Sequence, residues 1–144
     1  MIKLCFDLNI YRCYFSFCFI LNCMEKKKVM ALIAHDNKKA DIVAWSLINL
    51  DKLKQFDLIG TGHTASLISE KTGLSVKGYL SGPMGGDQEI GALIATGQVD
   101  FVVFFWDPLQ AQPHDPDVKA LMRIAAVYDI PFATNEATAN CLLK

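Results

Sequence analysis

The stretch Val29-Met-Ala-Leu-Ile-Ala34 is apolar at every position, and the polar pair His35-Asp36 follows it directly. A short apolar run of this kind is typical of a strand that is covered on both faces in a parallel sheet. Further runs rich in β-branched or aromatic residues recur along the chain. They lie at residues 56–60, 76–80, 101–106 and 131–134.

Segments with helical periodicity separate these runs. The clearest follows residues 101–106, where Asp115 supplies an N-cap and Pro116 a proline at the first helical position. Its buried face is predicted at Val118, Leu121, Met122 and Ala125. The other signals are an apolar stripe of Val43, Leu47 and Leu50 and the C-terminal glycines Gly73 and Gly97. The alternation predicts a single α/β domain, a three-layer α/β/α sandwich with a five-stranded parallel sheet of the Rossmann-like or flavodoxin-like kind.

The composition indicates a small-molecule partner. The chain has 144 residues, with 14 Lys and Arg against 15 Asp and Glu, so its net charge is −1. No basic block suggests a surface for nucleic acid or for membrane lipids. Five cysteines are present, without a CxxC pair. We therefore expect no metal site, no disulfide framework and no cofactor.

Residues 1–23 differ from the rest of the chain because they are rich in aromatic residues and cysteine. The apolar run at 13–21 resembles part of a signal peptide, but Asp7 and Arg12 precede it closely and no small-residue cleavage site follows. The run is also shorter than the roughly 20 apolar residues that a membrane-spanning helix needs. We expect that translation begins at Met24 or Met30 and that residues 24–144 form the domain.

In an open α/β sheet the ligand binds beyond the carboxyl ends of the strands, so the residues after each predicted strand are the most informative about function. These residues are unusually polar in this chain. They are His35-Asp36 with Lys38 and Lys39, Thr61-Gly62-His63-Thr64, Ser81-Gly82-Pro83-Met84-Gly85-Gly86-Asp87, and residues 107–117. Because the carboxyl ends of parallel strands meet at one edge of the sheet, we expect these clusters to converge there.

The stretch Gly60-Thr61-Gly62-His63-Thr64-Ala65 matches the loose dinucleotide pattern GxGxxG/A. However, residues 78–81, at the end of the next strand, lack the acidic residue that would bind a ribose hydroxyl. A loop of small hydroxyl residues that opens a helix also suits a phosphate group, since backbone N–H groups and the helix N-terminus attract an anion. We therefore favour phosphate over a dinucleotide. A third interpretation is that Thr64 serves only as a helix cap.

Asp87 precedes a predicted helix, so it is either an N-cap or a functional carboxylate. Its neighbourhood favours function, because His114, Asp115 and Asp117 follow another strand and would meet it at the same edge. His35 or Lys39 alone would more often be an ordinary surface residue. In combination, these residues are expected to bind the phosphate and carbonyl oxygens of a ligand.

Three longer segments resemble the signature segments of the methylglyoxal synthase family. They are SGPMGGDQ (81–88), FFWDPL (104–109) and PHDPDVKAL (113–121), with Ala34-His35-Asp36 upstream, and the likeness covers about residues 30–142. The resemblance implies a cytoplasmic homohexamer that converts dihydroxyacetone phosphate to methylglyoxal and phosphate without a metal or cofactor and is inhibited by phosphate. It implies Asp87 and His114 as catalytic residues and the substrate-binding set His35, Lys39, Thr61, Gly62, His63, Thr64, Ser81 and Gly82. We add Asp36 and Asp117 as supporting carboxylates.

The chain departs from the family pattern at His63 and Ala65, where a threonine and a glycine are usual, and it ends at Lys144, whereas family members continue through a further strand and helix.

The alternative function is a regulatory ligand-binding module, since a similar domain senses effectors in carbamoyl phosphate synthetase. Asp87 and His114 both stand in synthase-like contexts, which favours the enzyme.

Overall fold

The computed structural model describes residues 26–110 and 115–144 of the chain. Its elements follow the predicted alternation of strands and helices. In chain order they are β1 (Val29–Ala34), η1 (Asp36–Lys38), α2 (Lys39–Ile48), α3 (Leu50–Leu53), β2 (Asp57–Thr61), α4 (Gly62–Thr72), β3 (Val76–Tyr79), η2 (Gly82–Met84), α5 (Gly86–Ala95), β4 (Phe101–Phe105), α6 (Asp115–Val127), β5 (Phe132–Ala133) and α7 (Glu136–Leu142), where η marks a short 3-10 helix.

The strands form one five-stranded sheet in the order β3-β2-β1-β4-β5, and every pair is parallel. The predicted parallel sheet is therefore confirmed, with strand ends within two residues of those predicted. β1 lies at the centre, where Leu32 pairs with Gly60 of β2 and with Val103 of β4. The chain leaves β1 toward β2 and later returns to its other side as β4. A strand order that reverses in this way creates the crevice in which α/β proteins bind ligands.

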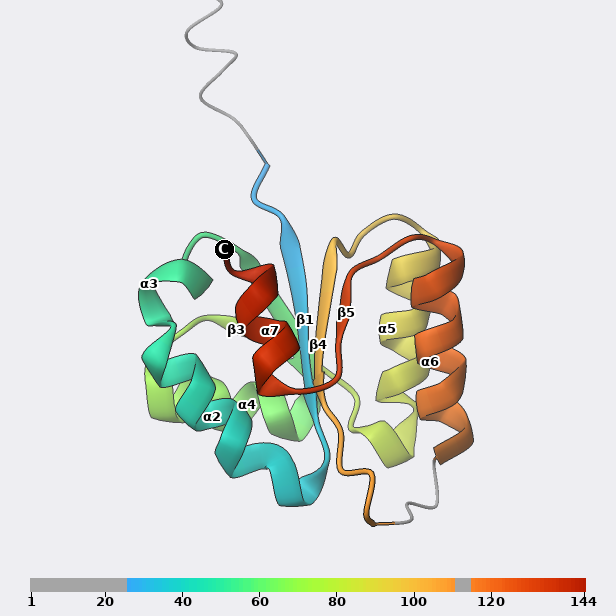
Figure 1. Ribbon diagram of the computed structural model, residues 1–144, viewed down its shortest axis with the longest axis horizontal. Helices are drawn as coiled ribbons and strands as arrows, with labels where there is room; N and C mark the ends of the chain where they lie inside the picture. Colours follow the sequence, from blue (N-terminus) through green and yellow to red (C-terminus); the bar gives the residue numbers. More distant parts are fainter. Residues whose placement is uncertain (1–25, 111–114) are drawn as a thin grey trace, which may run out of the picture.

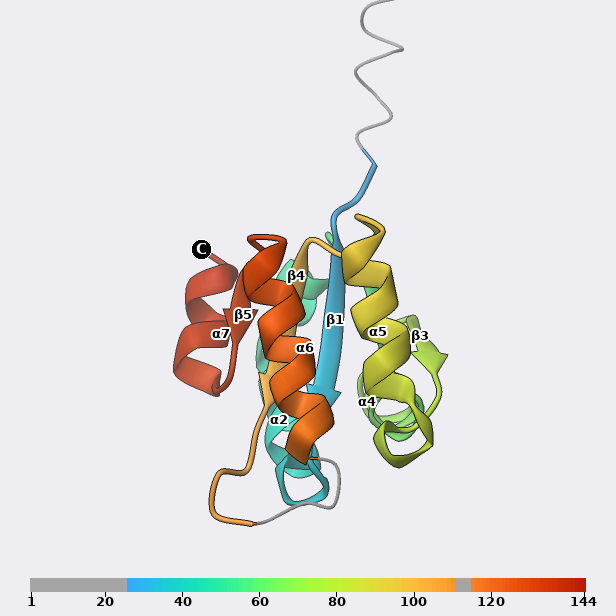
Figure 2. The same cartoon turned by 90° about the vertical axis from the view of Figure 1, so that its right-hand side faces the viewer.

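Helices cover both faces of the sheet and make three layers (Figure 1). Alternate residues of β1 enter different cores: Met30, Leu32 and Ala34 pack with residues of α2, α4 and α7, whereas Ala31 and Ile33 pack with residues of α5 and α6. Figure 2 shows α5 and α6 side by side over their face of the sheet. The apolar β1 sequence is thus explained by burial on both faces.

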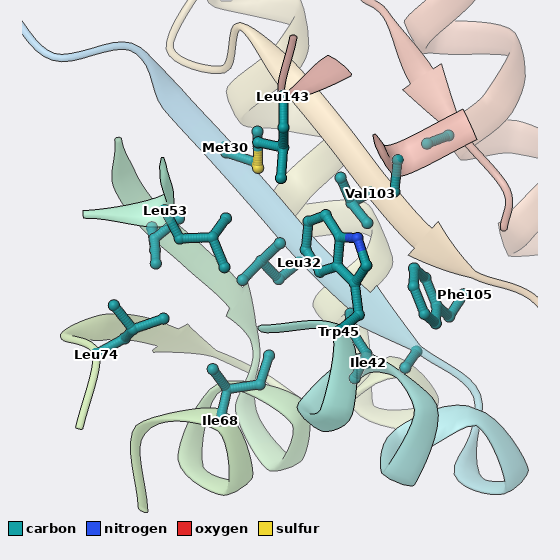
Figure 3. Packing of buried hydrophobic residues seen from close by; sticks show 14 residues of the cluster. Met30, Leu32, Ile42, Trp45, Leu53, Ile68, Leu74, Val103, Phe105 and Leu143 are labelled. Carbon is teal, nitrogen blue, oxygen red and sulfur yellow. The ribbon is translucent and has the colours of Figure 1, made fainter. Parts of the chain in front are cut away.

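The core on the α2 face is built around Trp45, which is 1 % exposed (Figure 3). Its ring lies 5.8 Å from that of Phe105, and its Nε1 donates a hydrogen bond of 2.8 Å to Asn140 of α7. The predicted α2 stripe was partly wrong, because Leu47 is 45 % exposed. The helix ends at Ile48, so Leu50 belongs to a separate turn and the stripe spans a break. The buried face consists of Ile42, Trp45 and Ser46, at the spacing of one helical face.

The other helix signals agree with the structure. Gly73 and Gly97 have φ of 73° and 68°, the left-handed conformation typical of a residue that ends a helix. α6 begins at Asp115, one residue earlier than predicted, and Val118, Leu121 and Ala125 are buried on its inner face, whereas the predicted Met122 is only partly buried. Within the part of the chain that the structure describes, no helix combines the length and apolarity needed to cross a membrane.

Candidate active site

A cavity of about 230 Å³ opens at the carboxyl ends of the central strands. It brings together the polar clusters that follow β1, β2 and β3, which are three of the four clusters that were predicted to converge. In Figure 1 this is the end of the sheet toward which the β1 arrow points. The lining residues are Ile33, Ala34, His35, Asp36, Lys39, Thr61, His63, Thr64, Ser81, Gly82, Pro83, Asp87 and Phe104.

His35 connects the loop after β1 to the end of β4. Its backbone N–H donates to the Phe105 carbonyl at 3.2 Å, which continues the sheet ladder by one residue. Its ring packs against the edge of Phe104 with centroids 5.0 Å apart, and the Asp107 backbone N–H donates to its Nδ1 at 3.2 Å. The side chain is therefore held by both neighbouring segments, and His35 is only 5 % exposed.

Lys39 supplies a positive charge to the cavity. Its ammonium donates to the Asp36 carboxylate of η1 and contacts His63 Nδ1 of α4 at 2.8 Å. An ammonium has three donors, so a third remains for a ligand in the cavity. The Lys39 side chain is 15 % exposed and that of Asp36 is 83 % exposed, so Asp36 holds the lysine from the outer side. Among the described residues that line the cavity, Lys39 is the only lysine or arginine.

β2 leads directly into α4, and this junction places two hydroxyl residues in the cavity wall. Thr61 and Thr64 are 6 % and 1 % exposed, and their hydroxyl oxygens lie 3.3 Å apart. Gly62 was predicted to bind substrate, but it does not line the cavity, and its N–H donates to the Leu80 carbonyl. A β-carbon there would lie 2.6 Å from the Tyr79 carbonyl oxygen. Gly62 therefore allows close contact between backbone segments and does not contact the cavity directly.

Gly60 has a similar role, because a β-carbon there would lie 2.5 Å from the Leu32 carbonyl oxygen on β1. Both glycines of the GxGxxA pattern are thus required for packing at the sheet. Their presence needs no dinucleotide, which agrees with the preference for phosphate.

The loop after β3 turns sharply and places Asp87 in the first turn of α5. Gly85 has φ of 99° and is the N-cap of α5, so the interpretation of Asp87 as the N-cap was wrong. The backbone explains why glycine occupies position 86: its N–H donates to the Ser81 carbonyl, and a β-carbon would lie 2.0 Å from the Leu80 carbonyl oxygen. Asp87 is 5 % exposed, so a carboxylate is buried in the cavity wall beside Ser81 and Gly82.

The two predicted supporting carboxylates, Asp36 and Asp117, differ in their position relative to the cavity. Asp117 lies in α6 and is partly exposed, and it does not line the cavity. His114 lies outside the residues that the structure describes. Asp36 is in the lining, as expected.

Sequence reasoning did not single out Asn37 or Asp107. Asp107 is 9 % exposed, and its carboxylate accepts hydrogen bonds from the Asn37 side chain at 3.1 Å and the Leu109 backbone at 3.1 Å. These bonds, with the Asn37 bond as the largest cause, hold the pKa of Asp107 below its usual value. Asp107 was part of a predicted cluster, but no sequence signal distinguished it there. Asn37 could have been noticed only as the residue directly after His35-Asp36.

Taken together, the cavity presents a buried carboxylate, an ammonium, an imidazole and small hydroxyl groups. Such a set can bind a small phosphorylated molecule and exchange a proton with it. Within the described residues, no cluster of His, Cys, Asp and Glu could hold a metal ion.

Comparisons with known proteins agree with this arrangement. The family model described as "MGS-like domain" matches residues 43–134. The methylglyoxal synthase of Clostridium acetobutylicum is 59 % identical over 121 residues, which are 84 % of this chain and 83 % of that protein. The methylglyoxal synthase of Cellvibrio japonicus is 54 % identical over 120 residues, covering 83 % and 78 %. The crystal structure of methylglyoxal synthase from Elizabethkingia anophelis superposes with a TM-score of 0.78 at 50 % identity, covering 82 % of this chain and 78 % of that one. The chain therefore belongs to the methylglyoxal synthase family.

Proposed function

We propose that this protein is a methylglyoxal synthase that converts dihydroxyacetone phosphate to methylglyoxal and inorganic phosphate, with Asp87 as the base. The observation that carries the proposal is the burial of the Asp87 carboxylate, 5 % exposed, in a wall of the same cavity that Lys39 and Ser81 line. A proton acceptor and a group able to bind phosphate thus lie within one small cavity. That pairing suits a phosphorylated substrate with an acidic C–H bond.

In the first step, Asp87 removes a proton from the hydroxymethyl carbon next to the ketone. The electrons of the broken C–H bond form the enediolate, whose negative charge lies mainly on the former carbonyl oxygen. A carboxylate is a weak base toward carbon, so this step requires donors that are fixed near that oxygen. We assign this role to His114 and to the Gly82 backbone N–H.

In the second step, the enediolate expels phosphate. The bond between the other carbon and the phosphate oxygen breaks, and the electron pair leaves with inorganic phosphate. The hydroxyl group on the first carbon passes its proton to the departing phosphate as it becomes the aldehyde, and the resulting enolate takes back the proton held by Asp87 at its methylene carbon and becomes methylglyoxal. The leaving bond must stand perpendicular to the enediolate plane for the π electrons to overlap with it. We assign this orientation to Lys39 and Ser81 and to the loop of Thr61, Gly62, His63 and Thr64, although Gly62 acts there only through the backbone fold.

Several finer properties belong to the same proposal. We propose inorganic phosphate as an inhibitor, because the groups that hold the substrate phosphate would also hold the free ion. On the resemblance to the family, we further propose a cytoplasmic homohexamer and supporting roles for Asp36 and Asp117. We also propose that residues 24–144 form the synthase-like domain and that residues 1–23 are dispensable. The alternative of a regulatory ligand-binding module is less favoured, because such a module does not need a buried carboxylate such as Asp87.

The test is to incubate the purified protein with dihydroxyacetone phosphate and to measure methylglyoxal, phosphate and glyceraldehyde 3-phosphate separately. We expect methylglyoxal and phosphate to appear in equal amounts. Phosphate without methylglyoxal would indicate a phosphatase, and glyceraldehyde 3-phosphate would indicate an isomerase. Binding of the substrate without any product would favour the regulatory module.

A further inference from the structure

The side chain of Asn37 joins the loop after β1 to the loop after β4. Its amide nitrogen donates to the Asp107 carboxylate at 3.1 Å and also to the Gln110 side-chain oxygen. Asn37 itself is exposed and does not line the cavity, so it has no direct contact with a ligand there. Its contacts instead hold both ends of the segment from Asp107 to Gln110.

The held segment contains the backbone N–H that contacts His35. The Asp107 N–H donates to His35 Nδ1 at 3.2 Å. A nitrogen that accepts a hydrogen bond cannot carry a proton, so a neutral His35 has its proton on Nε2. The ring is therefore a hydrogen-bond donor through Nε2, and such a donor attracts the oxygens of a phosphorylated ketone. The opposite tautomer would present a lone pair at Nε2 and would repel an enediolate or phosphate oxygen.

The position of the Asp107 backbone depends on its own side chain. The carboxylate is fixed on one side by Asn37 and on the other by the Leu109 N–H at 3.1 Å. The carboxylate is ionised at neutral pH, as an aspartate ordinarily is, and its charge strengthens both hydrogen bonds, which in turn lower the pKa of Asp107. Lys38 adds a favourable charge interaction at longer range.

We propose that Asn37 is a positioning residue, which anchors the loop after β4 so that the Asp107 N–H holds the His35 imidazole as the tautomer protonated at Nε2. Asn37 thus acts on the substrate through Asp107 and His35. The part of this inference that concerns catalysis rests on the proposed function, whereas the part that concerns the tautomer does not.

The test combines Asn37→Ala with the control Gln110→Ala, which removes the partner of the second Asn37 bond and leaves Asp107 in place. The tautomer of His35 is read from the ¹⁵N chemical shifts of its ring nitrogens, at a pH where the ring is neutral. The sequence has three histidines, so the His35 signals are assigned by their loss in His35→Gln. kcat and KM are measured on the same samples.

In the unmodified protein we expect His35 Nδ1 to have the shift of a fully unprotonated nitrogen. In Asn37→Ala both shifts should move toward the averaged values of a free imidazole, and kcat should fall about 10-fold to 100-fold, as for other losses of precise positioning, while KM changes much less. Gln110→Ala should keep the tautomer and the turnover.

The proposal is overturned if the unmodified protein carries the His35 proton on Nδ1, or if Asn37→Ala leaves the ring shifts unchanged whatever its activity. A loss of the tautomer in Gln110→Ala equal to that in Asn37→Ala would overturn it as well. An unmodified protein without methylglyoxal production would refute the proposed function, but the tautomer measurement would still decide the role of Asn37.

Discussion

The interior of this domain and the carboxyl end of its sheet bury different kinds of side chain. Both faces of the sheet are packed with apolar residues such as Leu32, Trp45 and Ile90, each at most 1 % exposed. At the carboxyl end, the structure buries polar side chains instead. They are His35, Thr61, Thr64, Asp87 and Asp107. Among the described residues, Ser46 is the buried polar side chain that lies elsewhere, and it donates to the Ile42 carbonyl within its own helix.

This difference shows how stability and function are separated in the molecule. Burial of apolar surface stabilises the fold, whereas burial of polar groups costs free energy unless their hydrogen bonds are satisfied. Apart from Ser46, the buried polar side chains of the described residues lie at the ligand-binding end of the sheet, which is typical of a functional site where chemistry is kept at a cost in stability. Substitutions at the two regions should therefore affect different quantities, which the following predictions test.

The largest expected effect is on turnover, in Asp87→Asn. An amide cannot accept a proton from carbon, so kcat should fall by about 10² to 10⁴ or more. The variant should still bind phosphoglycolate, a mimic of the phosphorylated enediolate, and should melt near the temperature of the unmodified protein. Steady-state kinetics and a thermal scan provide the measurements. Near-normal turnover would remove Asp87 as the base, and Asp36 and Asp117 would be the next residues to test.

A core substitution should show the reverse pattern. Leu32 on β1 is 0 % exposed, and Leu32→Ala should lower the free energy of unfolding by about 2–5 kcal/mol through lost burial and the remaining cavity. Urea denaturation measures this change. At temperatures where the variant stays folded, its kcat should remain close to normal. A fall in kcat comparable to that in Asp87→Asn would show that the two regions are not separated as described.

Intermediate effects are expected for the residues assigned to the phosphate group. Lys39→Ala removes a charged hydrogen bond, with a typical contribution of about 1.5–3 kcal/mol, so KM should rise roughly 10-fold or more while kcat falls less.

Ser81→Ala removes a neutral hydrogen bond, with a typical contribution of roughly 0.5–1.5 kcal/mol to binding, and should raise KM only a few-fold. Lys54→Ala is the matched control, since Lys54 pairs with Asp51 in an exposed salt bridge away from the cavity. An unchanged KM in Lys39→Ala would remove that residue from the phosphate site.

The smallest effect concerns pH and Asp107. The pKa of Asp107 is lowered in the folded protein, chiefly by Asn37, so its ionisation stabilises the fold above the ordinary aspartate pKa of about 3.9. That contribution is lost as the pH falls through the lowered value. In Asn37→Ala the pKa of Asp107 should return toward its usual value. Urea denaturation should therefore show a smaller difference between the variant and the unmodified protein near pH 3 than at pH 7. An equal difference at both pH values would contradict this linkage.

The sequence alone predicted the strands, because a strand covered on both faces must be apolar along its length, and β1 occurs at the predicted Val29–Ala34. It also predicted where the polar clusters would meet, since parallel strands share one carboxyl end. The helix ends at Gly73 and Gly97 could also be predicted, because they depend on a local property: both glycines adopt positive φ, which other residues rarely do.

The tertiary structure decided the features that depend on contacts between distant segments. The buried face of α2 depends on where the helix ends and on the contacts of Trp45 with β4 and α7. The apolar stripe that included Leu47 therefore predicted the wrong face. Gly60 and Gly62 looked like part of a dinucleotide loop until the approach of neighbouring backbone carbonyls explained them. The bond between Asp107 and His35 joins residues 72 positions apart. Periodicity reports only which face of an element is apolar, whereas a hydrogen bond of this kind exists only once β1 and β4 lie side by side.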